Sequence, residues 1–313
     1  MSRTVLVTGA AGFVGSAVTK KLSAQGDRVI AVDGLLGGLY PPDEKIQRFD
    51  TISSLRGVDA HRLDLRHDDL SVLPADIDHV INEAAMPGLG LSWSDFELYS
   101  SCNLSSVARL MDQAKRWPLK KFVQISTSSV YGKNAVGDEN MPTLPVSPYG
   151  VTKLAAENLA FAYMRDSDVP VTVLRYFSVY GPGQRPDMAY RKFISKALAG
   201  EAIDLYGTGD QSRSNTFIDD CVAGTISALN SARVGEVYNI AGSMERSLNE
   251  ALAIISDLVG RTLDVRHHDK ARGDQDRTFG DTTKASQELG FVNSTSLEEG
   301  LKAQIQWQRD GGL

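Results

Sequence analysis

Residues 8–15 read Thr-Gly-Ala-Ala-Gly-Phe-Val-Gly, and they join an apolar run at 5–7 to a stretch with helical spacing at 13–25. The three glycines are three residues apart, after an expected strand and at the start of an expected helix. Such spacing lets backbone N–H groups approach a pyrophosphate at the positive end of the helix. The segment therefore predicts a phosphate-binding turn.

An acidic residue follows this turn at a sequence spacing that is typical of ribose binding. Asp33 ends a second apolar run at 29–32, eighteen residues after Gly15. A carboxylate at this place can bind both ribose hydroxyls of an adenosine, and it would repel a 2′-phosphate. Because no Lys or Arg follows until Lys45, the sequence favours NAD over NADP.

Outward from this segment, β-branched runs alternate with helical patterns over the first 180 residues. Further strands are expected at 79–82, 121–125 and 171–175, with helices at 103–116 and 149–165. This alternation predicts a doubly wound α/β fold with a mostly parallel sheet that is covered on both faces. The last third is less regular, with helices expected near 190–199, 219–230, 246–259 and 296–309.

The composition narrows the class of protein. The 313 residues are 42% hydrophobic and 23% charged, which is ordinary for a globular protein. A net charge of -6 lacks the electrostatic footprint of a nucleic-acid binder. No apolar run is long enough to span a membrane, and Cys102 and Cys221 give neither a disulfide framework nor zinc-ligand spacing. We expect a cytoplasmic protein that binds no nucleic acid, membrane or metal.

Two features beyond the glycine turn indicate chemistry. Tyr149 and Lys153 are four residues apart in an expected helix and so share a face. We expect the ammonium to lower the pKa of the Tyr149 phenol, which makes a tyrosine useful as an acid or base near neutral pH. Just upstream, residues 124–132 run from a strand into a hydroxyl-rich loop. Ligands bind beyond the carboxyl ends of parallel strands, so this loop is placed to hold a polar substrate.

Taken together, these residues resemble the extended short-chain dehydrogenases/reductases that act on nucleotide sugars. The matching segments are residues 8–15, Asp33, 64–65, 84–85, Asn103, 126–132, 149–153, 174–182, 206–213, 219–220, 238–239, 272–274 and 289–290. The resemblance implies a Rossmann-like domain with tightly held NAD at 1–177, to which segments near 215–240 return. It also implies a smaller α/β nucleotide-sugar domain at 178–313, and a homodimer built from the helices near 103–116 and 149–165.

The resemblance also implies roles for single residues. Thr127 would hydrogen-bond the sugar O4, Tyr149 would remove the O4 proton, and Lys153 would bind the nicotinamide ribose. Arg213 and Arg272 match arginines that clamp the nucleotide diphosphate, which suits a guanidinium fork. The implied cofactor-binding residues are Gly9, Gly12, Phe13, Val14, Gly15, Asp33, Asp64, Leu65, Ala84, Ala85, Asn103, Ser126, Tyr149, Lys153 and Tyr176.

The hydroxyl loop narrows the reaction within this family. Dehydratases similar to this chain carry an Asp-Glu pair where Ser128 and Ser129 stand, and uronate decarboxylases usually carry a Glu in the same loop. Their absence points to a 4-epimerase. Ser178 and the Arg-Pro-Asp-Met-Ala run at 185–189 look like UDP-glucuronate 4-epimerases. The resemblance then implies that Thr127, Ser128, Ser129 and Ser178 surround the sugar carboxylate, with Arg185 nearby.

Three departures from the family pattern leave the identity of the sugar undecided. Gly90 and Gly183 stand where arginines are common in the family, and Asn82 stands where His is frequent. A UDP-glucuronate decarboxylase and a 4-epimerase of UDP-glucose or UDP-N-acetylglucosamine remain alternatives. An NAD-binding regulator without catalysis is a further alternative, and the intact Thr127, Tyr149 and Lys153 argue against it.

Overall fold

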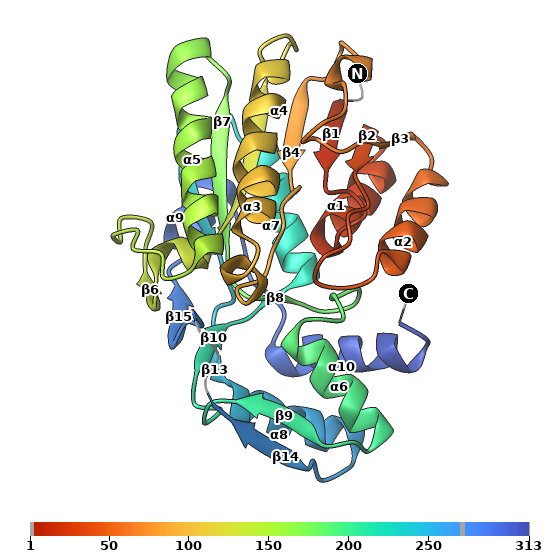
Figure 1. Ribbon diagram of the computed structural model, residues 1–313, viewed down its shortest axis with the longest axis vertical. Coiled ribbons are helices and arrows are strands. Elements are labelled where there is room, and N and C mark those ends of the chain that lie inside the picture. Colours follow the sequence, from red (N-terminus) through yellow and green to blue (C-terminus); the bar gives the residue numbers. More distant parts are fainter. Residues whose placement is uncertain (1–2, 270–272, 313) are drawn as a thin grey trace.

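The computed structural model describes residues 3–269 and 273–312. Its centre is a seven-stranded sheet in the order β12-β7-β5-β4-β1-β2-β3, in which every pairing is parallel (Figure 1). The strands are β1 (Thr4–Thr8), β2 (Arg28–Asp33), β3 (Val58–Arg62), β4 (His79–Asn82), β5 (Lys121–Thr127), β7 (Val171–Tyr176) and β12 (Val237–Ile240). The expected doubly wound α/β fold is confirmed.

Helices bury both faces of this sheet. The helices α1 (Phe13–Ala24), α2 (Asp43–Ser53) and α7 (Ile218–Asn230) pack with Val5 and Val7 in one apolar cluster. Leu6 faces the opposite cluster, which contains side chains of α4 (Ser106–Ala114) and α5 (Pro148–Ser167). Since successive strand side chains point to opposite faces, an uninterrupted apolar strand needs cover on both sides.

A smaller part lies beyond the carboxyl ends of the main sheet (Figure 1). Its four-stranded sheet has the order β13-β10-β15-β6, and two short pairs join β8 to β11 and β9 to β14. The strands are β6 (Asn134–Gly137), β8 (Val179–Tyr180), β9 (Ile203–Tyr206), β10 (Ser212–Ser214), β11 (Thr216–Phe217), β13 (Glu245–Ser247), β14 (Val265–His268) and β15 (Arg277–Gly280). The helices α6 (Ala189–Ala199), α8 (Leu248–Val259) and α10 (Leu297–Arg309) pack on one another.

Short helical segments complete the described chain. They are η1 (Leu70–Val72), η2 (Leu91–Trp93), α3 (Phe96–Ser100), η3 (Ser101–Ser105), η4 (Ser128–Tyr131) and α9 (Thr283–Leu289). Within residues 3–269 and 273–312, no helix is long and apolar enough to cross a membrane, and no cluster of His, Cys, Asp and Glu is arranged to hold a metal ion.

The chain crosses between the two parts several times. The strand β12 lies beside β7 in the large sheet, whereas β6 pairs with β15 in the smaller one. The sequence patterns did not predict α2, β3 or β12. β3 lies at the edge of the sheet and carries polar residues among its few apolar ones, so its pattern lacks a long apolar run.

Candidate active site

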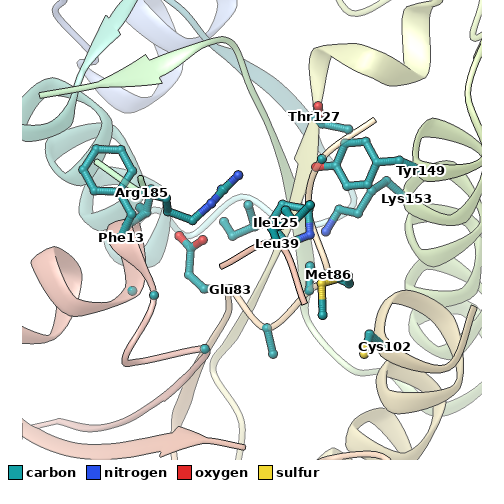
Figure 2. A pocket seen from close by; sticks show the side chains of 18 of the residues that line it. Phe13, Leu39, Glu83, Met86, Cys102, Ile125, Thr127, Tyr149, Lys153 and Arg185 are labelled. Atoms are coloured by element: carbon teal, nitrogen blue, oxygen red, sulfur yellow. The ribbon is translucent and has the colours of Figure 1, made fainter. Parts of the chain in front are cut away.

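One cavity lies where the two parts meet, at the carboxyl ends of the parallel strands (Figure 2). The residues that line it come from much of the sequence, the first being Gly9, after β1, and the last Gln275, just before β15. The strand order reverses between β1 and β4, and the crevice at such a reversal is the usual ligand site of a doubly wound sheet. The fold thus brings the glycine turn and the hydroxyl loop to a single site.

The glycine turn forms a cradle that side chains would fill. Gly9 has φ +65°, and a Cβ there would lie 2.8 Å from the backbone nitrogen of Ala84. A Cβ on Gly12 would lie 3.0 Å from the carbonyl oxygen of Gly9, and one on Gly15 would clash with the same oxygen. Gly12 caps α1 without a side-chain hydrogen bond, so the first N–H groups of that helix stay available. The cradle therefore fits a dinucleotide diphosphate.

Two carboxylates border the cavity at the carboxyl ends of the strands β2 and β3. Asp33 accepts the backbone N–H groups of Ala11 at 2.9 Å and of Leu35 at 2.7 Å, and each of its oxygens keeps a second lone pair for a ribose hydroxyl. Asp64 forms an ion pair of 2.7 Å with Arg66, whose hydrogen bond lowers the pKa of that carboxyl. Both carboxylates and Leu65 border the cavity.

The hydroxyl loop continues directly from β5. Thr127 ends that strand, and its hydroxyl oxygen accepts the N–H of Ser129 at 3.2 Å, capping the short helix η4. Ser128 donates to the Oε1 atom of Gln275 at 3.3 Å, while the Gln275 amide donates to the carbonyl oxygens of Ser128 and Gly132. The segment before β15 thereby holds the loop in place.

Tyr149 and Lys153 come from the first turns of α5, which starts after the capping residue Ser147. Both side chains point into the cavity, near Thr127 (Figure 2). Burial raises the pKa of Tyr149 above the ordinary tyrosine value, although a hydrogen bond with Thr127 and the charge of Arg185 both lower it. The expectation of a lowered pKa is wrong, because desolvation of the enclosed phenol dominates and Lys153 is not among the groups that act on this pKa.

Burial also acts on the ammonium of Lys153. It lowers the pKa of Lys153 to about 8, against the opposing charges of Glu83 and Glu157. Glu157 lies one helical turn further along α5, accepts the hydroxyl of Ser126, and pairs with Arg175 at 2.7 Å. The buried Glu157–Arg175 pair thus lies directly behind the side chains that face the cavity.

The remaining substrate-binding candidates line the cavity from the smaller part. Ser178, Arg185 and Arg213 all border it. Arg185 is held by two hydrogen bonds of 2.9 Å to Asp187, and its guanidinium points into the pocket (Figure 2). Arg213 donates to Asp274 at 2.8 Å and to the Gln275 carbonyl at 2.7 Å. Arg272 lies outside the described residues.

Most cofactor candidates border the cavity: Gly9, Gly12, Phe13, Val14, Gly15, Asp33, Asp64, Leu65, Ala84, Ala85, Ser126, Tyr149, Lys153 and Tyr176. Asn103 does not. Its side chain bonds the N–H of Met86 at 2.6 Å, the Met86 carbonyl at 3.0 Å and the Thr152 hydroxyl at 3.1 Å. Asn103 therefore fixes the loop that follows β4, from behind the cavity wall.

Two of the three departures from the family pattern, Asn82 and Gly183, have local structural partners. Asn82 accepts the Thr8 hydroxyl at 2.6 Å and donates to Gln124 at 2.9 Å, which links three neighbouring strands. Gly183 has φ +85°, and its carbonyl accepts the buried Arg48 guanidinium at 2.8 Å. Gly90 precedes η2 and is exposed.

Sequence reasoning missed several residues that border the cavity, among them Glu83 and Gln275. Glu83 stands between β4 and the Ala84–Ala85 pair, and a carboxyl next to a buried strand could have drawn attention to it. Gln275 had no local signal, since its role depends on contact with a loop 147 residues away in sequence.

Comparison with known proteins agrees with this geometry. Residues 5–241 match the model of the NAD dependent epimerase/dehydratase family. This chain belongs to that family. It is 36% identical to the uncharacterized UDP-glucose epimerase YtcB of Bacillus subtilis, over 96% of both chains. It is 32% identical to the UDP-glucuronate 4-epimerase of Thermodesulfobacterium geofontis, over 97% of this chain and 96% of that relative.

A solved structure is also very similar. The UDP-glucuronic acid 4-epimerase of Bacillus cereus in complex with UDP-glucuronic acid and NAD superposes with a TM-score of 0.95 at 36% identity. The match covers 98% of this chain and 99% of the other. The extended dehydrogenase/reductase family that the sequence motifs indicated is therefore confirmed.

Proposed function

We propose that this protein converts UDP-glucuronate into UDP-galacturonate by inverting carbon C4, with NAD as its bound cofactor. One observation carries the proposal: Thr127, Tyr149 and Lys153 share a cavity with the glycine cradle, and the hydroxyls of Ser128 and Ser178 border the same space. The likeness to the Bacillus cereus enzyme supports both the sugar and the cofactor.

The side chains suit reversible oxidation at C4. NAD, when bound, supplies the acceptor and later the donor of a hydride. Tyr149 takes the proton of the sugar O4 as the C4 hydride leaves, and it returns that proton after the 4-keto sugar has presented its other face. Thr127 and the Arg185 charge favour the phenolate that this step requires. Lys153 holds the nicotinamide ribose.

Oxidation of a uronate opens a side reaction, the loss of CO2, which the hydroxyls of the cavity prevent. Oxidation of glucuronate at C4 gives a β-keto acid, which loses CO2 when its C5–carboxylate bond stands perpendicular to the carbonyl plane. Donors that grip the carboxylate prevent that alignment. We assign this grip to Thr127, Ser128, Ser129 and Ser178, with Arg185 adding charge, while Arg213 and Arg272 hold the diphosphate.

Product analysis tests the proposal. The protein is incubated with UDP-glucuronate and the products are followed by NMR, where UDP-galacturonate is the expected product. A UDP-pentose as the main product would establish the decarboxylase instead. Turnover of UDP-glucose or UDP-N-acetylglucosamine without turnover of UDP-glucuronate would overturn the assignment of the sugar.

The same proposal includes a cytoplasmic homodimer formed by α4 and α5. These helices lie side by side on one outer face of the sheet (Figure 1), and Val151 of α5 is 47% exposed. Light scattering should give twice the chain mass for the wild type and the monomer mass for Val151→Glu. A wild-type monomer at micromolar concentration contradicts the dimer without bearing on the reaction.

A further inference from the structure

Glu83 borders the cavity, yet the reaction described above does not use it. It lies across the pocket from Tyr149 and Lys153 (Figure 2). The proton leaves the sugar O4 and the hydride leaves the carbon C4 that carries it, so the reacting end of the dinucleotide lies beside Tyr149 and Lys153. Glu83 therefore faces the reacting end, where a carboxylate attracts the positive charge of the oxidised nicotinamide ring.

The hydrogen bonds of Glu83 accommodate both of its protonation states. The Tyr176 hydroxyl donates to the Oε1 atom of Glu83 at 2.9 Å and lies 2.6 Å from the hydroxyl of Thr225, which donates to the Cys221 carbonyl at 2.7 Å. An ionised Glu83 accepts the Tyr176 proton, and Thr225 then turns its own proton from the Cys221 carbonyl to the Tyr176 oxygen. A neutral Glu83 can instead donate to Tyr176, which then donates to Thr225. The carboxyl can thus change its charge while its neighbours stay in place.

The titratable groups around Glu83 come from three elements, and Lys153 is the cation among them. Lys153 and Tyr149 face it from α5, Tyr176 from β7 and Cys221 from α7. Burial raises the pKa of Glu83 to about 7, while the Tyr176 hydrogen bond and Lys153 lower it. Among the described residues, Glu83 and Lys153 form no direct ion pair, so the Glu83 charge is not neutralised by contact.

We propose that the Glu83 carboxylate stabilises the oxidised, cationic nicotinamide over the neutral reduced ring, and thereby favours return of the hydride to the sugar. Two opposite charges in a partly desolvated cavity attract more strongly than in water. The C4–H bond breaks and its electron pair moves to the nicotinamide, while the O4 proton moves to Tyr149. Both return at the end of the cycle. Glu83 gains and loses no bond, and it acts through its charge.

A preference for the oxidised cofactor suits an epimerase, which must return the hydride to the sugar. A dehydrogenase, in contrast, releases its oxidised product. If the reduced cofactor and the keto sugar were the more stable pair, the intermediate would accumulate and could escape or lose CO2. A fixed negative charge beside the ring raises the energy of that pair relative to the oxidised cofactor and the alcohol. The proposal needs NAD and oxidation at C4, and it holds for any sugar.

The test compares the reduction potential of bound NAD in the wild type and in Glu83→Gln, by titrating the NAD-loaded proteins with mediator dyes. Gln keeps the shape and an oxygen acceptor for Tyr176 but removes the charge. At pH 8 we expect the ratio of reduced to oxidised cofactor in the variant to be about tenfold higher at a given potential, a shift of about 30 mV for this two-electron couple. Glu83→Asp, which keeps the charge, should stay within about threefold of the wild type.

The pH dependence gives a second readout. Below pH 7 Glu83 becomes neutral, so the difference between the wild type and Glu83→Gln should shrink at pH 6. Three results would each overturn the proposal. They are equal potentials of the wild type and Glu83→Gln at pH 8, the same shift in Glu83→Asp as in Glu83→Gln, and a difference between wild type and Glu83→Gln that does not depend on pH. Because the titration uses no sugar, its result is separate from the assignment of the substrate. If Glu83→Gln does not retain NAD, the Asp variant and the wild-type pH series still decide whether the Glu83 charge sets the potential of the bound NAD.

Discussion

At the scale of single residues, the hydroxyls of the cavity differ in how they are held. Ser128 donates to Gln275 and is part of a buried network, whereas Ser178 follows β7 and borders the cavity. Both are assigned to the sugar carboxylate, for which Ser128 turns its O–H from Gln275 to the carboxylate. A hydroxyl lost there frees the carboxylate to rotate. The chemistry of a β-keto acid makes the product ratio a more specific readout than the rate.

Replacing Ser128 or Ser178 by Ala should increase the UDP-pentose by-product relative to UDP-galacturonate. We expect a rise of about tenfold or more, because losing one hydrogen bond to a charged group costs about 1.5–3 kcal/mol. NMR integration of both products at equal conversion measures the ratio. Ser256→Ala, in the remote helix α8, serves as the control. A flat ratio in both cavity variants would contradict the carboxylate grip.

A buried cation away from the cavity gives a prediction about stability and pH. Burial lowers the pKa of Lys121 to about 8, and its ammonium bonds the Thr172 hydroxyl and the Arg233 carbonyl. Because the folded pKa lies below the unfolded one, Lys121 opposes folding fully below pH 8, and this cost fades between pH 8 and 10.5.

The stability of Lys121→Met relative to the wild type should therefore fall as the pH rises from 7 toward 10.5. Urea unfolding at both ends of that range measures the difference, whatever its absolute value at pH 7. Lys120→Met, a neighbour with an exposed side chain, is the control. A difference that stays constant or grows with pH contradicts the account of the desolvated ammonium.

At the scale of elements, the turn between β1 and α1 decides cofactor binding. Its glycines leave no room for side chains, since a Cβ on Gly15 would meet the Gly9 carbonyl. The clash involves backbone on both sides, so neither partner can rotate away. The turn can hold a diphosphate only while these positions lack side chains.

Gly15→Ala should purify with little or no NAD, and added NAD should raise its Tm less than it raises that of the wild type. The bound nucleotide is measured after denaturation and filtration. Gly26→Ala, at the open end of α1 where a Cβ meets nothing within 4 Å, controls for loss of glycine, although its φ of +85° adds some strain. Full NAD content in Gly15→Ala would show that the turn can widen, contrary to this account.

At the scale of the whole molecule, two elements from different parts are joined beside the cavity. Arg191 of α6 donates to both oxygens of Glu44 in α2, at 2.7 and 2.8 Å, and Arg48 of α2 bonds the Gly183 carbonyl. These contacts tie the segment that carries Arg185 to the large sheet. The position of Arg185 therefore depends on packing between the parts as well as on its own loop.

Glu44→Gln should raise the KM for the UDP-sugar severalfold while kcat changes less than about twofold, because it loosens the wall of the sugar site and leaves Tyr149 untouched. Steady-state kinetics measures both constants. Glu236→Gln breaks a comparable ion pair, with Lys284, away from the cavity and should leave KM unchanged. A lower kcat with unchanged KM in Glu44→Gln would place its effect on the chemical step.

The sequence by itself determined the parallel sheet, the glycine turn and the residues that carry the family resemblance, because these depend on local patterns and short spacings. The strand β3 escaped prediction because it lies at an edge of the sheet. The local pattern did not reveal β12 as a strand either, although the family resemblance implied that segments near 215–240 return to this domain. Only the tertiary structure decided the raised pKa of Tyr149, the place of Asn103 behind the wall, and the approach of Glu83 and Gln275 to the cavity. The physical reason is that burial and contacts between distant segments set the local electrostatics, and neither appears in a pattern of neighbouring residues.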